Sequence, residues 1–231
     1  AGTLTSMLCE SAKKVYSYEI DNNLKPILST VQAKYDNLDL TFKDIMKEDI
    51  SSLEDRIGED YVIVANLPYY ITTPIIMDLL ENERHVDSIT VMVQKEVALR
   101  IAAKPGTADY SAFTVFCQFY AQPEILFDVP AHCFLPQPKV TSAVITLKTR
   151  KTLPWDVHDR AIFFRAVRAS FAMRRKKLQN GLAAGFPELG KQGVGEVIAA
   201  CGFDENVRGE TLSIAQFVEL ANEIYRRRNH V

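Results

Sequence analysis

The sequence predicts an α/β protein with a small all-helical C-terminal domain, on the strength of three observations. Short runs rich in β-branched residues, such as Tyr61–Ala65 and Ser88–Val93, alternate with helical patterns, which is typical of a doubly wound sheet. After Lys151 the chain shows only helical spacing. Hydrophobic residues make up 47% and charged residues 24% of the 231 residues, as in ordinary globular proteins. We therefore expect one domain over residues 1–151 and a second over 152–231.

Four strands and two helices are expected in the first part of the α/β domain. The expected strands are Val15–Ile20, Leu38–Phe42, Tyr61–Ala65 and Ser88–Val93, the last two being of the buried, parallel kind. Thr73-Pro74 predicts the start of a helix, because a cap residue precedes a proline at the first helical position. A second helix over Lys95–Ala103 is expected to end before Pro105-Gly106.

The α/β domain is expected to close with two antiparallel strands, Ile125–Val129 and Val140–Leu147. The proline-rich segment Pro130–Pro138 between them leaves no room for the crossover helix that a parallel pair needs. Beyond this pair, helical spacing extends over residues 158–183, 191–201 and 213–228. These three stretches constitute the predicted helical domain.

Charge is distributed unevenly along the chain, although the formal net charge is only −2. Residues 1–150 carry 14 basic and 20 acidic side chains, whereas residues 151–231 carry 13 and 9. Seven of the basic residues fall within 160–177, where no acidic residue occurs. A basic part on an acidic body suggests a polyanionic partner such as nucleic acid, although a solvated helix face would have the same pattern.

The sequence disfavours several kinds of site and location. The four cysteines are far apart and form no metal-binding pattern, which argues against a metal site and for a reducing, cytoplasmic setting. No apolar run approaches the ~20 residues needed to span a bilayer, and no signal segment opens the sequence. Nothing in the sequence indicates an obligate partner chain, so a monomer is expected.

Polar residues lie at the ends of three expected strands. Glu19 is the penultimate residue of Val15–Ile20, Asp44 follows Leu38–Phe42, and Asn66 follows Tyr61–Ala65. Ligands of open parallel sheets bind at the carboxyl ends of the strands, where a carboxylate can accept hydrogen bonds from both hydroxyls of a ribose. Asp44 would suit an adenine amino group. Each of these residues is also common in turns, but the three together favour a nucleotide-like ligand.

The most specific motif is Asn66-Leu67-Pro68-Tyr69, directly after an apolar strand. It resembles the catalytic motif of adenine-N6 methyltransferases, and we assign all four residues to the catalytic site. The Asn66 side-chain oxygen and the Pro68 carbonyl would accept the hydrogens of the adenine amino group and stabilise the positive charge that develops on its nitrogen. Tyr69 would stack against a flipped-out base, which is worth roughly 1–3 kcal/mol. The alternative is a plain strand-to-loop turn with a buried tyrosine.

Over essentially its whole length, the sequence resembles the 16S ribosomal RNA adenine dimethyltransferases. The matching stretches are Tyr18–Asp21, Val64–Pro74, Met92–Ala98, Phe134–Val140, Phe164–Ala172 and Arg174-Arg175-Lys176. The resemblance implies a Rossmann-like, S-adenosylmethionine-dependent methyltransferase sheet with a helical rRNA-binding domain. The implied reaction dimethylates N6 of two adjacent adenosines near the 3′ end of 16S rRNA in the 30S subunit, with a role in 30S biogenesis.

The resemblance also implies roles for single residues. Glu19 would bind the ribose of the cofactor and Asp44 its adenine, while Asn66 would contact both the cofactor and the target. Phe134 would form a second aromatic wall for the target base, although a hydrophobic plug under the proline loop is an alternative role.

The basic residues of the C-terminal domain would bind rRNA. The residues assigned to this role are Arg165, Arg168, Arg174, Arg175 and Lys176. Arg165, Arg168 and Arg175 recur at spacings of three and seven, so we expect them close to one face of a helix. Such a face would follow RNA phosphates by charge, and its binding would weaken steeply as salt rises.

The sequence departs from the family at its N-terminus. The family carries a glycine-rich loop after its first strand, and only the tail of such a loop is present, at Ala1–Thr5, where Gly2 would contact the cofactor. In the family that strand lies mid-sheet, so a sheet without it would have an unpaired gap. We therefore expect the sequence to be a fragment, and the 231-residue chain to bind S-adenosylmethionine weakly or not at all.

Two other functions fit the same motifs. A 23S rRNA adenine-N6 methyltransferase of the macrolide-resistance type shares the chemistry, but the Arg/Phe-rich helical pattern and the Phe134–Val140 segment look more like the small-subunit enzyme. The second alternative function is that of a non-catalytic 30S assembly factor, which can coexist with methyl transfer.

Overall fold

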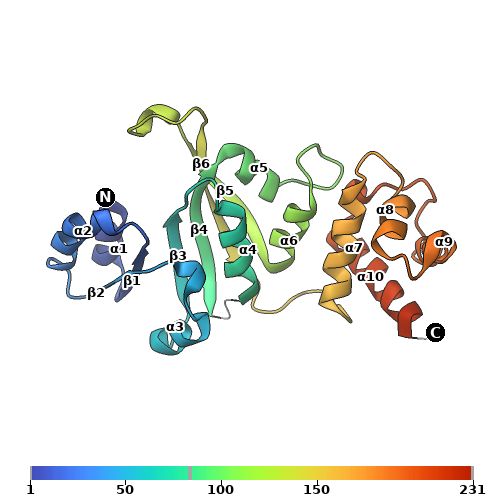
Figure 1. Cartoon of the computed structure of the whole chain (residues 1–231), viewed down its shortest axis with the longest axis horizontal. Coiled ribbons are helices and arrows are strands. Elements are labelled where there is room, and N and C mark those ends of the chain that lie inside the picture. Colours follow the sequence, from blue (N-terminus) through green and yellow to red (C-terminus); the bar gives the residue numbers. More distant parts are fainter. Residues whose placement is uncertain (1, 83–84, 230–231) are drawn as a thin grey trace. The chain divides into compact units, whose positions relative to one another are not determined.

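The computed structural model describes residues 2–82 and 85–229 (Figure 1). The chain forms two compact units, one ending at Gly58 and the other beginning at Glu59. The described strands lie in two separate sheets, one in each unit.

The first unit is a pair of parallel strands with short helices around it. Its elements are α1 (Thr3–Ser11), β1 (Val15–Glu19), α2 (Lys25–Gln32), β2 (Leu38–Phe42) and α3 (Ile50–Ile57), with single 3₁₀ turns at Asn22–Leu24 and Ile45–Lys47. The two strands run in register from Val15 opposite Leu38 to Glu19 opposite Phe42. Both predicted strands are therefore confirmed, and their apolar residues form a small core with Cys9.

The second unit is built on a four-stranded sheet in the order β3-β4-β6-β5. Its strands are β3 (Tyr61–Asn66), β4 (Val86–Gln94), β5 (Ala121–Val129) and β6 (Ser142–Thr149). β3 and β4 are parallel, while β6 is antiparallel to both of its neighbours, which confirms the predicted antiparallel pair. β5 begins four residues earlier than predicted because it is an edge strand, where Pro123 is tolerated.

Three helices belong to this sheet: α4 (Thr72–Asn82), α5 (Lys95–Ile101) and α6 (Ala112–Tyr120). α4 starts one residue before the predicted Thr73-Pro74 position, and its buried apolar side chains include Ile75, Ile76 and Leu79. α6 begins with a capping box, in which the side chains of Ser111 and Thr114 each bond to the backbone of the other residue.

Four helices follow the sheet: α7 (Arg160–Ala172), α8 (Leu178–Gly185), α9 (Gly190–Ala200) and α10 (Ile214–Asn229). The stretch 158–183, predicted as continuously helical, is two helices, because α7 ends at Ala172 and α8 begins at Leu178. These helices share one hydrophobic core with the sheet, and Phe119 of α6 packs against Phe163 and Phe164 of α7. A separately folding domain over 152–231 stays a prediction.

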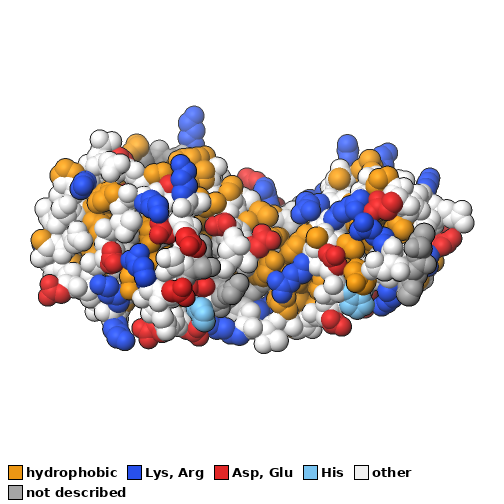
Figure 2. Space-filling view, turned by 60° about the horizontal axis from the view of Figure 1, so that its bottom comes forward, with side chains coloured by type: hydrophobic (Ala, Val, Ile, Leu, Met, Phe, Trp, Pro, Cys, Tyr) orange, Lys and Arg blue, Asp and Glu red, His pale blue; other side chains and the backbone are white. Residues whose placement is uncertain are grey.

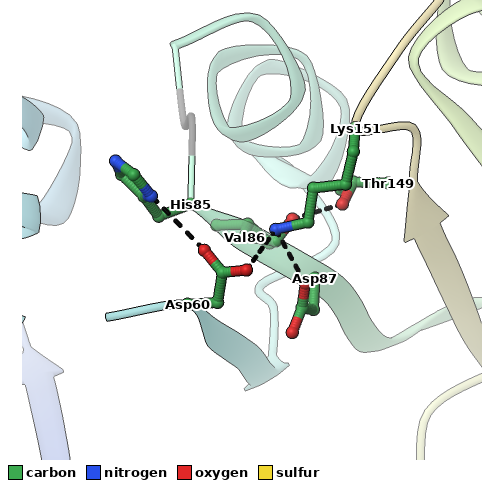
Figure 3. A network of polar contacts seen from close by, with 6 residues as sticks. All are labelled: Asp60, His85, Val86, Asp87, Thr149 and Lys151. Atoms are coloured by element: carbon green, nitrogen blue, oxygen red, sulfur yellow. Dashed lines mark hydrogen bonds and ion pairs between the residues drawn. The ribbon is translucent and has the colours of Figure 1, made fainter.

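A polar network fixes the chain segment that leaves the sheet for α7 (Figure 3). The Lys151 ammonium lies 2.9 Å from Asp60, which precedes β3, and 2.8 Å from Asp87 in β4. His85 lies 3.3 Å from the other oxygen of Asp60, and the Thr149 hydroxyl donates to the Val86 carbonyl. The ammonium and the imidazole hold the pKa of the Asp60 carboxyl below its usual value by hydrogen bonding.

Candidate active site and nucleic-acid interface

The Asn66–Tyr69 segment forms an exposed elbow at the end of a parallel strand. Asn66 is the last residue of β3 and pairs with Met92 of β4, so it stands at the carboxyl edge of these strands. The side chain of Leu67 is buried and anchors the elbow in the core, whereas Asn66 and Pro68 are exposed. The amide of Asn66 is therefore accessible to a ligand at the edge where parallel sheets bind ligands.

The Pro68 carbonyl differs from the sequence-based expectation. It accepts a hydrogen bond from the backbone N–H of Ile71 at 3.2 Å and a second one from the Thr72 hydroxyl at 3.0 Å. A peptide carbonyl has two lone pairs, and both are used here. These bonds shape the turn that leads into α4, and they leave the Pro68 oxygen without a lone pair for an adenine amino group.

Tyr69 is anchored at its hydroxyl end. Its hydroxyl forms a 2.6 Å hydrogen bond with the hydroxyl of Ser142, the first residue of β6, which is completely buried. The tyrosine itself is only partly buried, so part of its side chain is accessible. Sequence analysis missed Ser142, because no local pattern links it to a residue 73 positions away.

Phe134 lies in the segment that joins β5 to β6, which Figure 1 shows projecting from the sheet. Its side chain is partly buried, and Leu135 beside it is fully exposed. Among the described residues, the aromatic ring pairs do not include Phe134. Its role as a second wall for a base stays a prediction.

The predicted cofactor carboxylates lie in the first unit, at one edge of its parallel pair. Glu19 ends β1 and Asp44 follows β2 by two residues. One oxygen of Glu19 accepts from the Asp21 amide at 2.8 Å, and one oxygen of Asp44 accepts from the Met46 amide at 3.1 Å. Each carboxylate has further acceptor positions, which fits ribose hydroxyls and an adenine amino group.

Gly2 has a conformation that few other residues adopt. Its φ is +82°, and a Cβ atom there would lie 2.8 Å from the Val31 side chain. It stands at the N-terminus of α1. Because a glycine is required by the backbone itself at this position, its presence alone does not assign it to a cofactor.

Arg165 is partly buried and bound by several contacts to the helical part of the second unit. Its guanidinium donates to the Gly185 carbonyl at 2.7 Å, forms two 3.0 Å bonds with Glu188 and lies 4.2 Å from the centre of the Phe186 ring. Burial would raise the pKa of Glu188, but hydrogen bonds to its own backbone and to Arg165 bring that pKa below its usual value. Arg168, in contrast, is exposed.

Arg175 lies outside the helix that carries Arg165 and Arg168, which corrects the prediction that the three share one helix face. Arg174 and Arg175 lie beyond Ala172, where α7 ends, so the helical spacing that would align Arg175 with Arg165 is lost. Arg174 bonds to Glu210 at 2.6 Å and to the Thr107 carbonyl at 2.9 Å.

A basic cavity of about 430 Å³ adjoins the start of α8. The cations that line it are Arg175, Lys176, Lys177, Lys191 and Arg208, and none of the described residues in its lining is acidic. The Leu178 amide bonds to the Val207 carbonyl at 2.8 Å, which brings residues 177 and 208 together. On the face seen in Figure 2, Lys and Arg side chains also gather over the C-terminal helices.

Two of these five cations, Arg175 and Lys176, were among the rRNA-binding residues predicted from the sequence. Lys177 continues the run Arg174–Lys176, so the sequence held a signal for it, whereas Lys191 and Arg208 reach the cavity only through the fold.

The family described as "Ribosomal RNA adenine dimethylase" matches residues 1–226. The chain belongs to the ribosomal RNA adenine dimethylase family. "Ribosomal RNA small subunit methyltransferase A" of Geobacillus kaustophilus (strain HTA426) is 45% identical over 228 residues, which cover 96% of this chain and 78% of the relative. The protein of the same name from Clostridioides difficile (strain 630) is 48% identical over 225 residues, with the same coverage.

Solved structures share the fold of this dimethylase family member. A dimethyladenosine transferase from Plasmodium falciparum matches with a TM-score of 0.83 at 23% identity, covering 98% of this chain and 87% of that one. The 23S rRNA methyltransferase ErmE matches with a TM-score of 0.71 at 24% identity, covering 97% and 87%. These likenesses confirm the predicted methyltransferase-like α/β fold with C-terminal helices.

Two further findings concern only the described residues of this dimethylase. In residues 2–82 and 85–229, none of the helices has the length and apolar character to pass through a membrane. Within the same residues, His, Cys, Asp and Glu side chains form no group of three or more that would hold a metal ion.

Proposed function

We propose that the Asn66–Tyr69 elbow binds the target adenine of the reaction. The observation that carries this proposal is the exposed amide of Asn66 at the carboxyl edge of β3, next to a tyrosine whose hydroxyl is anchored. An adenine amino nitrogen is a weak nucleophile because its lone pair is delocalised into the ring. Acceptors aimed at its hydrogens would localise that lone pair and stabilise the charge that develops on nitrogen.

The protein is an S-adenosylmethionine-dependent rRNA adenine dimethyltransferase of the small-subunit type, as its family and its relatives with 44–48% identity establish. When bound, S-adenosylmethionine supplies an electrophilic methyl group. We assign its ribose to Glu19 and its adenine to Asp44, with Gly2 allowing close approach of the backbone. The free acceptor positions of the two carboxylates support this assignment.

The backbone acceptor of the elbow is assigned to Leu67. The Pro68 carbonyl is occupied by Ile71 and Thr72, so the preceding carbonyl is the one we pair with the Asn66 side-chain oxygen. The buried side chain of Leu67 supports this assignment, because it would hold that peptide unit in place. No strong general base is needed, since the amino nitrogen becomes acidic once it is methylated and its proton can pass to water.

The basic cavity beside α8 is assigned to phosphates of the rRNA. Five cations converge on it without an acidic neighbour in its lining, which suits a polyanion recognised by charge and shape. Arg168 is exposed and can add to this interface, while the ion pairs of Arg165 and Arg174 give these two residues a structural role as well.

The substrate is assigned as two adjacent adenosines near the 3′ end of 16S rRNA within the 30S subunit. An enzyme with this substrate works in the cytoplasm, where ribosomal subunits are assembled. We expect a single copy of the chain to act.

Methylation assays on immature 30S particles and on protein-free 23S rRNA test this proposal. S-adenosylmethionine is supplied in excess over the enzyme. We expect methylated adenines in the 30S particles. Methylation of the protein-free 23S rRNA alone would assign the enzyme to the other substrate.

A further inference from the structure

The first residue of β6 lies close to the elbow because of the direction of its strand. β3 and β4 are parallel, so their carboxyl ends lie at one edge, and antiparallel β6 starts at that edge. In the ladders, Gln94 of β4 and Val129 of β5 both pair with Ser142. Ser142 is thus a fixed point of the sheet, completely buried, with its hydroxyl 2.6 Å from that of Tyr69.

We propose that Ser142 is a positioning residue of the methyl-transfer reaction, which holds the Tyr69 ring in the orientation that receives the target base. This inference rests on the proposed binding of adenine at the elbow. Ser142 touches neither base nor cofactor in the proposal. It acts through the hydroxyl of Tyr69.

Tyr69 requires such a support because of its place in the chain. It lies between the end of β3 at Asn66 and the start of α4 at Thr72, outside any regular element. Its neighbour Tyr70 is 83% exposed, so the elbow is open to solvent on that side. A tyrosine side chain has two soft torsions, and fixing the far end of the ring restricts both. A held ring stacks on a base at a smaller cost in conformational entropy.

The same bond connects the elbow to a second part of the proposed site. Ser142 ends the segment that carries Phe134, and the adjacent Thr141 carbonyl accepts from the Lys95 amide at 3.0 Å. The end of this segment, at Thr141 and Ser142, therefore bonds both to the sheet and to Tyr69.

A purely structural hydroxyl pair occurs on the same strand and serves as a matched control. Thr146 lies four residues along β6 from Ser142, and its hydroxyl forms a 2.9 Å hydrogen bond with the hydroxyl of Thr90 in β4. Thr146 is 7% exposed, so its bond is similarly buried. Because side chains alternate along a strand, Ser142 and Thr146 point to the same face of the sheet.

The experiment compares the wild-type chain with Ser142→Ala, Tyr69→Phe, the double variant and the control Thr146→Val. Steady-state methylation of immature 30S particles gives kcat and KM, equilibrium binding gives the affinity for the particles, and thermal unfolding gives stability. We expect Ser142→Ala to lower kcat about tenfold or more, with KM and particle affinity within about twofold of wild type. Tyr69→Phe removes the same hydrogen bond without removing any side-chain atom from β6, so it should lower kcat by the same factor. The double variant should lose no more kcat than either single variant.

The control separates positioning from stability. Thr146→Val is expected to lower the unfolding temperature and to leave kcat within about twofold of wild type. The proposal would be overturned if Ser142→Ala or Tyr69→Phe kept the wild-type kcat. It would also be overturned if the kcat losses of the two single variants multiplied in the double variant, or if Thr146→Val lost as much kcat as Ser142→Ala. If Ser142→Ala does not fold, Tyr69→Phe decides alone. An inactive wild type would overturn the proposed function and this inference with it, whereas an active wild type with unaffected variants would overturn the inference only.

Discussion

Replacing Arg165 by alanine should destabilise the protein, although its sequence pattern suggested a role in RNA binding. The side chain satisfies the Gly185 carbonyl, pairs with Glu188 and covers the Phe186 ring. An unsatisfied carbonyl costs about 1–3 kcal/mol, a half-exposed ion pair contributes about 0.2–1 kcal/mol and the cation–ring contact about 0.5–1 kcal/mol. We therefore expect a loss of about 2–5 kcal/mol in the free energy of unfolding.

Thermal unfolding measures this loss, with Arg168→Ala as the control. For a chain of this size, the expected change corresponds to a decrease of about 4–20 °C in the unfolding temperature. Arg168 lies one turn further along the same helix and is exposed, so its replacement should change the free energy of unfolding by less than about 0.5 kcal/mol. Equal unfolding temperatures of the two variants would refute the reasoning.

Two further predictions concern charge. Lys191→Glu and Arg208→Glu should each weaken binding to 30S particles and reduce the slope of log affinity against log salt by about one, and an unchanged slope would remove the cavity from the interface. Lys151 and His85 hold the pKa of the Asp60 carboxyl below its ordinary value of 3.8. The stability that the ionised Asp60 contributes is therefore fully present above pH 3.8, and it is lost as the pH falls through the lower pKa of the folded state. Lys151→Ala should therefore make the unfolding temperature fall less steeply between about pH 5 and 3, and an unaltered pH profile would contradict this.

The strands and the elbow could be predicted because their signals are local. An apolar β-branched run followed by Asn66 and Pro68 indicates both a buried parallel strand and the turn at its end. The start of β5 was missed because a proline is usually read as a strand breaker, whereas Pro123 lies on an edge strand.

Contacts between distant residues account for most of what the sequence could not predict. The end of α7 at Ala172 was not predicted, because helix-like residue spacing continues in the sequence through the basic run that follows. The structural role of Arg165 depends on Glu188, and the basic cavity depends on Lys191. Neither partner is marked as such by its own neighbours in sequence.

The central claim is that the Asn66 amide promotes methyl transfer, and one variant tests it most directly. Asn66→Ala removes an acceptor of the developing charge, so single-turnover methylation of immature 30S particles with excess S-adenosylmethionine should fall about 100-fold or more. Asn66 is exposed and lies outside the basic cavity, so affinity for the particles should stay within about twofold of wild type. Methylation by this variant at a rate near that of wild type would contradict the account.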